Sequence, residues 1–293
     1  MTLPAVQRAY AKINLCLFVG PPRGDGRHEL LTLFDSLSLA DELRIVPGTG
    51  DSVVCAGVRE PNLVAGALEA LRAAGWEAPP LRVEIKKRIP VAAGMGGGSA
   101  DAAALLRLAP CLAPVRGQVI AEIAAGLGAD VPAQLDPGPS IGTGAGEILQ
   151  PVLALPPYGV LVLPQPFPLP TAAVYREADR LGLARASDEL SNLRDQLTAA
   201  VPDRLPSTLI VNDLQPAAVS LAPAIQDALQ AAEDAGADRT LVCGSGPTVI
   251  GLHTGADGLE RASAAAHALR GRFPGATAAG PVGRGVLHPT PNE

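Results

Sequence analysis

Apolar residues in the first third of the chain occur in short runs that are dense or alternate with polar residues, a pattern typical of β-strands. The runs are AKINLCLFV (11–19), LTLFDSLSL (31–39), ELRIV (42–46), SVVCAG (52–57) and LRVEI (81–85). Apolar residues three and four positions apart predict amphipathic helices at 62–74, 99–108 and 118–126. The first half of the chain is therefore expected to combine several strands with three helices.

The second half begins with a connection, residues 151–170, that has seven prolines and no charged residue. Twenty uncharged residues could span a membrane, but a spanning helix does not tolerate this many prolines. We therefore interpret the segment as a domain connection that contains one strand, YGVLVL (158–163). Beyond it, the pattern predicts helices near 171–181, 190–200, 216–235 and 259–272, a strand pair around CGSG (243–246) and a short final strand. Two α+β domains, residues 1–152 and 153–293, are expected.

Composition and charge restrict the classes of partner. Apolar residues make up 47% of the chain but aromatic residues only 3%, so the core must consist mainly of Ala, Val, Leu and Ile. The formal net charge of −6 argues against nucleic acid or an anionic membrane as the main partner. Asn14 interrupts the first apolar run and no small-residue cleavage site follows, so a strand is predicted rather than a signal peptide. The four cysteines form no C-x-x-C pair, and we expect reduced thiols in a cytoplasmic protein.

The stretch VAAGMGGGSADAAALLRL (91–108) has four glycines in five residues and continues into helix-forming residues. A strand, a glycine loop and a helix N-terminus in succession present backbone N–H groups and the positive end of the helix dipole, which suits a phosphate. Ser99 is expected to cap this helix and Asp101 to lie in its first turn. A flexible turn between strand and helix is the alternative. Neither common phosphate motif fits, because the chain has no Gly-Lys pair and because Ser99 replaces the third glycine of a Rossmann fingerprint.

Four stretches, in order along the chain, resemble the motifs of the GHMP small-molecule kinases. They are AYAKINLCL (9–17), IPVAAGMGGGSADAA (89–103), GLGADVPAQL (126–135) and CGSGPTVIGL (243–252). Any one of them is moderately specific, and the ordered set of four is strongly specific. The resemblance implies a two-domain α+β fold, with an N-terminal ATP-binding domain and the active site in the cleft between the domains.

Within this family, the combination of AKINL, DGRHEL (25–30), GGGSADAA and GADVP is closest to kinases whose acceptor carries a cytidine diphosphate group. The resemblance implies ATP-dependent phosphorylation of the tertiary 2-hydroxyl of a cytidine-diphosphate-linked methylerythritol, a step of non-mevalonate isoprenoid precursor synthesis. Mg²⁺ would arrive with the nucleotide, and no separate metal site on the protein is implied. The pattern indicates no nucleic-acid or membrane partner and no particular oligomeric state.

Two alternatives are a GHMP kinase for homoserine or a mevalonate derivative, and a nucleotide-binding regulator without catalysis. The segment DGRHEL favours the cytidyl substrate over the first alternative, because only that substrate needs a loop that reads a pyrimidine. The presence of both Lys12 and Asp130 argues against the second alternative, because a protein that only binds nucleotide needs no general base.

The resemblance implies that Lys12 and Asp130 are catalytic. Asp130 would be the base for the acceptor hydroxyl, and Lys12 would be the cation beside that hydroxyl and the transferring phosphoryl group. Each has another interpretation when taken alone. Asp130 could cap a short helix that begins near Pro132, and Lys12 could be a solvated lysine on a strand.

The binding residues implied by the resemblance fall into two sets. The expected ATP-binding residues are Asn62, Lys87, Pro90, Gly94, Gly96, Gly97, Gly98 and Ser99. The expected substrate-binding residues are Asn14, His28, Thr171 and Tyr175. Asn14 lies two residues beyond Lys12, so both side chains should point to the same face of a strand. The chain departs from the family pattern at Arg27, where an aromatic residue usually stacks on cytosine, and at Ala133 and Gln134, which replace aromatic residues.

Overall fold

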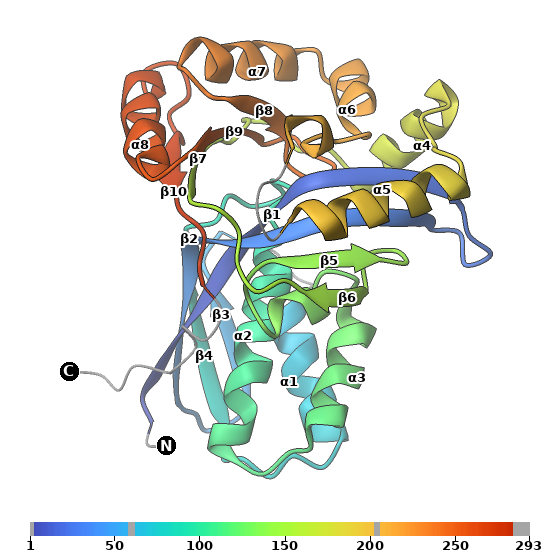
Figure 1. Cartoon of the computed structure of the whole chain (residues 1–293). Coiled ribbons are helices and arrows are strands. Elements are labelled where there is room, and N and C mark those ends of the chain that lie inside the picture. Colours follow the sequence, from blue (N-terminus) through green and yellow to red (C-terminus); the bar gives the residue numbers. More distant parts are fainter. Residues whose placement is uncertain (1–2, 58–61, 202–205, 284–293) are drawn as a thin grey trace.

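A computed structural model of the chain describes residues 3–57, 62–201 and 206–283. Two β-sheets form its framework (Figure 1). The strands of the first sheet are β1 (Ala5–Pro22), β2 (His28–Pro47), β3 (Ser52–Cys55), β4 (Leu81–Lys86), β5 (Ser140–Thr143) and β6 (Ile148–Pro151). The strands of the second sheet are β7 (Tyr158–Leu163), β8 (Arg239–Val242), β9 (Val249–Thr254) and β10 (Thr277–Ala279). The mixture of sheets and helices confirms the predicted α+β class.

The first sheet is built on β2, which pairs with three other strands. Strand β1 lies antiparallel to β2 along nearly its whole length, while β4 and β5 pair with opposite ends of β2. The outer strands are β3, parallel to β4, and β6, antiparallel to β5. Helices α1 (Leu63–Ala73), α2 (Gly97–Leu112) and α3 (Gly117–Leu127) cover one face of this sheet (Figure 1).

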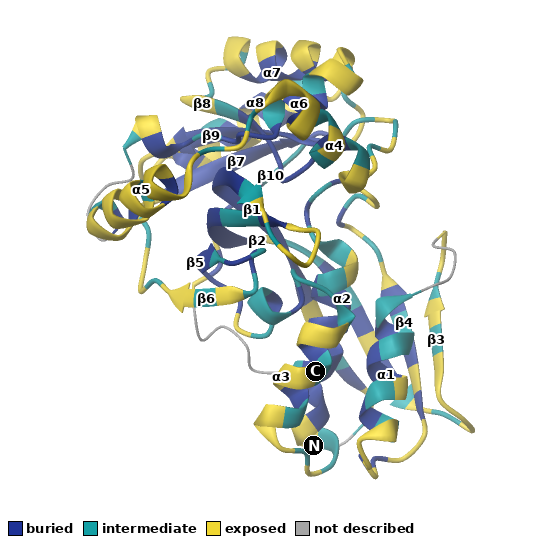
Figure 2. Cartoon of the chain, turned by 90° about the vertical axis from the view of Figure 1, so that its right-hand side faces the viewer, coloured by how far each residue is buried: buried dark blue, intermediate teal, exposed yellow. Residues whose placement is uncertain are grey.

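Helix α2 is the most deeply buried of these helices, because it packs against β1 and also against α1 and α3 (Figure 2). Its small residues Ala100, Ala102, Ala103 and Ala104 are fully buried, which allows close packing on more than one side. The glycine loop, defined here as residues 94–98, therefore leads into a helix that the surrounding core fixes in place.

The second sheet has the strand order β10-β7-β9-β8, and α7 (Ala224–Asp234) and α8 (Gly258–Leu269) pack on it. Helices α4 (Thr171–Leu181) and α6 (Gln215–Leu221) contact each other, and α5 (Ser187–Ala200) contacts β1. Isolated backbone bridges also connect the first sheet to the second half of the chain, between Leu17 of β1 and Asn212 and between Leu37 of β2 and Pro281. The described part of the chain contains no helix that is long and apolar enough to cross a bilayer.

The structure corrects some of the predicted elements. The runs at 31–39 and 42–46 belong to the single strand β2, because Asp41 between them is itself buried in the sheet. The helix expected near 216–235 is two helices, α6 and α7, separated at Pro223. Proline lacks an N–H and forces the preceding residue out of the helical region, and Ala222 has φ −140° and ψ 81°.

Candidate active site

Lys12 and Asn14 lie on the same face of β1, as predicted from their spacing. The Nζ of Lys12 donates a hydrogen bond to Oδ1 of Asn14 at 3.0 Å, and Nδ2 of Asn14 donates to Oγ1 of Thr32 at 2.8 Å. Only 7% of Lys12 is exposed, so the interpretation of a solvated strand lysine is wrong. Asn14 and Thr32 therefore fix the position of an ammonium group that the protein has largely removed from water.

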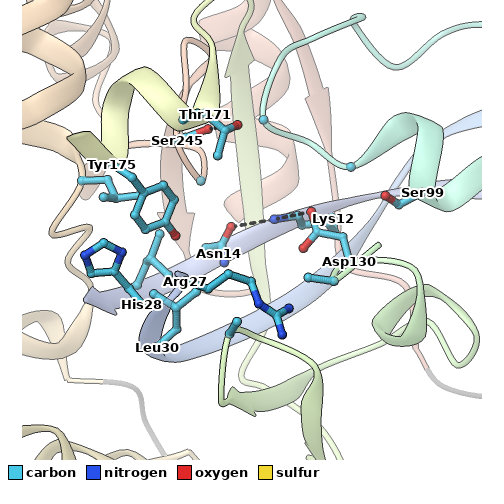
Figure 3. A pocket seen from close by; sticks show the side chains of 18 of the residues that line it. Lys12, Asn14, Arg27, His28, Leu30, Ser99, Asp130, Thr171, Tyr175 and Ser245 are labelled. Carbon is cyan, nitrogen blue, oxygen red and sulfur yellow. Dashed lines mark hydrogen bonds and ion pairs between the residues drawn. The ribbon is translucent and has the colours of Figure 1, made fainter. Parts of the chain in front are cut away.

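Asp130 lies opposite this ammonium, on the segment that links α3 to the short 3-10 helix η1 (Pro132–Gln134). Its Oδ2 is 3.5 Å from Nζ of Lys12, and 38% of its side chain is exposed. The interpretation of Asp130 as a helix cap is wrong, because Val131 occupies the N-cap position of η1. Asp130 is therefore paired on one side with a buried cation and open to solvent on the other (Figure 3).

The steric constraints that require glycine differ from one position of the loop to another. Gly94 (φ +75°) and Gly96 (φ +65°) adopt left-handed conformations that other residues rarely take. A Cβ at Gly94 would lie 2.3 Å from the carbonyl oxygen of Cys243, and a Cβ at Gly96 would lie 2.9 Å from Cγ of Lys12. These two glycines therefore permit contacts within the protein, whereas a Cβ at Gly98 would be 3.7 Å from its nearest neighbour, Cδ1 of Leu63. Packing within the protein therefore does not explain why residue 98 is a glycine.

Ser99 does not cap α2, contrary to the prediction. The helix begins two residues earlier than predicted, its N-cap is Gly96, and no side chain caps it. Asp101 consequently lies beyond the first turn. The first N–H groups of a helix have no partner within it, so the start of α2 presents uncapped donors and the positive end of the dipole.

Two cavities meet at the glycine loop, and Gly94, Gly96 and Ser99 line both. The larger cavity has a volume of about 750 Å³ and the smaller one about 300 Å³. The larger cavity contains all the expected catalytic and substrate-binding residues, namely Lys12, Asn14, His28, Asp130, Thr171 and Tyr175 (Figure 3). The smaller cavity contains all the expected ATP-binding residues, namely Asn62, Lys87, Pro90, Gly94, Gly96, Gly97, Gly98 and Ser99. The structure thus divides the predicted residues into the two expected sets, and which ligand each contacts stays a prediction.

His28 and Tyr175 lie side by side at the far end of the larger cavity, with ring centroids 5.3 Å apart and planes at 27° (Figure 3). The Nε2 of His28 is 2.8 Å from Oδ1 of Asp179. Burial, with a contribution from the charge of Asp130, raises the pKa of Tyr175 to about 12, so its hydroxyl stays protonated. Thr171, at the start of α4, shares a hydrogen bond of 2.9 Å with the hydroxyl of Ser245.

The sequence analysis missed two of these side chains. Asp179 lies one helical turn beyond Tyr175, so the spacing of α4 could have indicated that it faces the same site. Ser245 belongs to the CGSG segment, whose resemblance to a family motif was recognised without assigning it a residue. The guanidinium of Arg27, the departure from the family pattern, donates two hydrogen bonds to Asp25 and extends away from the His28 and Tyr175 rings (Figure 3).

Asn62 and Lys87 also have roles within the protein. Asn62 caps α1, since its Oδ1 accepts the N–H of Val64 at 2.9 Å. The Nζ of Lys87 lies 2.5 Å from Oδ2 of Asp41 and 2.7 Å from Oδ2 of Asp101. Both residues therefore line the smaller cavity while their polar atoms bind protein groups.

Comparison with known proteins agrees with this geometry. The family models described as GHMP kinases N terminal domain and GHMP kinases C terminal match residues 62–138 and 204–275. A 4-diphosphocytidyl-2-C-methyl-D-erythritol kinase from Salinispora tropica is 42% identical and covers 95% of this chain and 93% of its own length. The kinase of the same name from Streptomyces coelicolor is 41% identical, covering 85% and 87%.

Solved structures support the same family assignment. A crystal structure of 4-(cytidine 5'-diphospho)-2C-methyl-D-erythritol kinase is 34% identical, with a TM-score of 0.76 and coverage of 95% of this chain and 99% of that one. L. major mevalonate kinase, at 14% identity, TM-score 0.69 and full coverage of both chains, shares the fold alone. By sequence over most of its length and by structure, the chain belongs to the 4-diphosphocytidyl-2-C-methyl-D-erythritol kinase family of the GHMP kinases.

Proposed function

We propose that this protein transfers the γ-phosphoryl group of ATP to the 2-hydroxyl of 4-diphosphocytidyl-2-C-methyl-D-erythritol. The observation that carries the proposal is the ion pair between buried Lys12 and half-exposed Asp130. This pair lies in the larger cavity, and the glycine loop beside it lines both cavities. The names of the relatives support this acceptor over homoserine and mevalonate. The direct test is turnover of ATP with the cytidyl substrate, with homoserine and mevalonate as control acceptors.

In the proposed arrangement, ATP occupies the smaller cavity. Its phosphates lie at the N-terminus of α2, where uncapped N–H groups of Gly97, Gly98 and Ser99 favour negative charge. The acceptor occupies the larger cavity, and its 2-hydroxyl lies at Asp130. We also propose a domain boundary between residues 152 and 153, in the link between β6 and β7. A cytoplasmic location is part of the same proposal and agrees with the presence of four free cysteines.

The chemical step needs a base and a cation, and the pair supplies both. Asp130 accepts the proton of the 2-hydroxyl, the oxygen forms a bond to the γ-phosphorus, and the bond from that phosphorus to the bridging oxygen of ADP breaks. Lys12 offsets the charge on the transferring group and forms an ion pair with the carboxylate of Asp130. The hydrogen bond to Asn14 keeps Lys12 in the position that serves both functions.

Magnesium would enter this site with the nucleotide. Within residues 3–57, 62–201 and 206–283 there is no group of three or more His, Cys, Asp or Glu that could hold a metal ion. Mg²⁺ in kinase sites is commonly held by substrate phosphates, water and one or two protein oxygens, and the hydroxyl of Ser99 is placed to contribute one. When bound, the ion neutralises phosphate charge that Lys12 does not reach.

The far end of the larger cavity has the chemistry to recognise cytosine. When His28 donates its Nε2–H to Asp179, the neutral ring keeps Nδ1 as an acceptor. An acceptor matches the amino group of cytosine and not the carbonyl oxygen at the same position of uracil. Tyr175 offers an aromatic face beside it.

Replacing Gly98 by alanine is expected to weaken ATP binding about 5- to 150-fold, since forcing a methyl group into an occupied site costs roughly 1–3 kcal/mol. The empty protein accommodates the methyl group, because the nearest atom is 3.7 Å away, and alanine favours the helix by up to about 1 kcal/mol over glycine. Calorimetric titration with ATP and a thermal melt measure the two effects. Gly126→Ala, at an open position of α3, is the matched control and should leave ATP affinity unchanged. If Gly98→Ala and wild type bind ATP with equal affinity, the phosphates do not bind at this loop.

Replacing His28 by alanine is expected to abolish the preference for the cytidyl substrate over its uridyl analogue. A site built to hydrogen-bond one base rejects another because buried groups stay unpaired, and the loss of that bond removes the penalty. The measurement is kcat/KM for both substrates with wild type, His28→Ala and the control His267→Ala, which changes an exposed histidine of α8. A wild-type enzyme that uses both substrates equally would show that this end of the cavity does not read the base.

A further inference from the structure

The loop between β1 and β2, residues 23–27, borders the larger cavity at the point where this chain departs from the family pattern. Its last residue, Arg27, lines the cavity together with the following His28. The backbone N–H of Arg23 donates to the carbonyl oxygen of Arg27 at 2.6 Å, and Oδ1 of Asp25 accepts the N–H of Arg27 at 3.1 Å. These bonds close the loop and fix the backbone from which the Arg27 side chain extends.

Asp25 also holds one edge of the Arg27 guanidinium. Its Oδ2 accepts hydrogen bonds from Nη2 at 2.8 Å and from Nε at 3.1 Å, and Oε1 of Glu147 lies 4.0 Å from the same Nη2. Within the described residues, Nη1 of Arg27 has no hydrogen-bond acceptor, and 51% of the side chain is exposed. A guanidinium has five N–H donors in one plane, so Arg27 keeps donors free for a ligand while Asp25 fixes its orientation.

The guanidinium lies between the two ends of the proposed acceptor site. In Figure 3 it extends toward the middle of the cavity, with the His28 and Tyr175 rings on one side and the pair of Lys12 and Asp130 on the other. The proposed acceptor has its cytosine at the first end and its reacting hydroxyl at the second. The diphosphate that links the ribose to the methylerythritol therefore passes along the part of the cavity that Arg27 lines.

The charges that line the cavity favour an anion at this place. Both carboxylates of the lining already have partners, since Asp130 pairs with Lys12 and Asp179 contacts the histidine ring. Among the described residues, the other charged side chains of the lining are two cations, Arg27 and Arg176. The planar guanidinium matches the oxygens of a phosphate, and such charge-assisted hydrogen bonds are stronger than neutral ones.

We propose that Arg27 binds the linking diphosphate of the acceptor, at the position where the family pattern has an aromatic residue that stacks on cytosine. This inference rests on the proposed function and assigns the recognition of one further part of that substrate. Arg27 is preferred to Arg176, because Arg176 directly follows Tyr175 and so starts from the far end of the cavity. Asp25 keeps its bonds to one edge of the guanidinium while the free Nη1 donates to the phosphate oxygens.

The test is calorimetric titration of the full chain with CDP and with cytidine, in the presence of excess Mg·ADP to fill the smaller cavity. Arg27→Gln is expected to lower the affinity for CDP about tenfold, the lower end of what hydrogen bonds to charged groups contribute, and to leave the affinity for cytidine unchanged. In steady-state kinetics, KM for the cytidyl substrate should rise by a similar factor. Its kcat should stay near that of wild type, because the diphosphate takes no part in the reaction.

Arg180→Gln is the matched control, since it makes the same change at an exposed arginine of α4 that pairs with Glu177 and does not line the cavity. It should alter neither affinity, and a thermal melt verifies that each variant folds. If Arg27→Gln and wild type bind CDP equally well, or if Arg27→Gln loses as much affinity for cytidine as for CDP, this inference alone is overturned. A loss of CDP affinity in Arg176→Gln but not in Arg27→Gln would overturn it in favour of Arg176. A wild-type protein that binds neither CDP nor cytidine would overturn the proposed function as well.

Discussion

Replacing Asp130 by asparagine is expected to lower kcat about 10²–10⁴-fold, the usual contribution of a general base, while ATP affinity stays near that of wild type. Asparagine keeps the shape of the side chain and can still accept a hydrogen bond from Lys12, but it cannot take the proton of the acceptor hydroxyl. The fold should not change, because Val131 and not Asp130 is the N-cap of η1, and because 38% of the Asp130 side chain is exposed.

Steady-state kinetics with the cytidyl substrate measure the effect on kcat, and calorimetric titration with ATP measures binding. The control is Asp195→Asn, which makes the same change at an exposed position of α5 and should leave both quantities unaltered. A folded Asp130→Asn enzyme with the turnover of wild type would exclude Asp130 as the base. A loss of ATP affinity equal to the loss of kcat would instead assign it to nucleotide binding.

Local features of the sequence predicted most elements of the fold, because strands and helices are set largely by short-range patterns of apolar residues. The errors arose where tertiary contacts override such patterns. Asp41 interrupts an apolar run and suggested a break between two strands, yet β2 continues through it because Lys87 and two backbone N–H groups satisfy the buried carboxylate. The break at Pro223, in contrast, follows from a residue visible in the sequence.

The site itself could be predicted only through the family resemblance. Lys12 and Asp130 are far apart in the chain, and each alone has a structural interpretation that local patterns favour. Pairing two such residues requires the fold, since no periodicity connects a strand residue to one that follows a helix. The glycine loop shows the same limit. Its composition suggested an anion site. A side chain at Gly94, however, would clash with the carbonyl oxygen of Cys243, which belongs to the second half of the chain.

The ion pairs of Lys87 with Asp41 and Asp101 gave no sequence signal at all. Asp41 lies on β2, Asp101 on α2 and Lys87 just after β4, and each residue type is ordinary at its position. Asp101 was expected near a helix N-terminus, where an acidic residue stabilises the dipole. Because α2 begins at Gly97, Asp101 lies beyond the first turn and instead meets Lys87. A shift of two residues in the predicted helix start therefore concealed an ion pair, which shows why site chemistry needs more precise boundaries than fold class does.

Replacing Lys12 by methionine is expected to lower kcat about 10²–10³-fold, comparable to removing one preorganised group that stabilises transition-state charge. Methionine keeps most of the volume that fills the space beneath Gly96, so ATP binding and folding should change little. The loss has two parts, since the transferring group loses a nearby cation and Asp130 loses its ion-pair partner. Kinetics and ATP titration separate the effect on kcat from binding.

Lys12→Arg tests whether the position of the charge matters as well as its presence. The side chain packs tightly, since a Cβ at Gly96 would be 2.9 Å from its Cγ, and its Nζ lies between Asn14 and Asp130 and 5.1 Å from the centre of the Phe34 ring. A planar guanidinium is larger than an ammonium and distributes its charge, so it cannot reproduce this geometry, and kcat should fall although the charge is kept. Lys86→Arg, the same change at an exposed lysine of β4, should have no effect. Full activity of Lys12→Arg would show that any cation at this position suffices, and full activity of Lys12→Met would remove Lys12 from the chemical step.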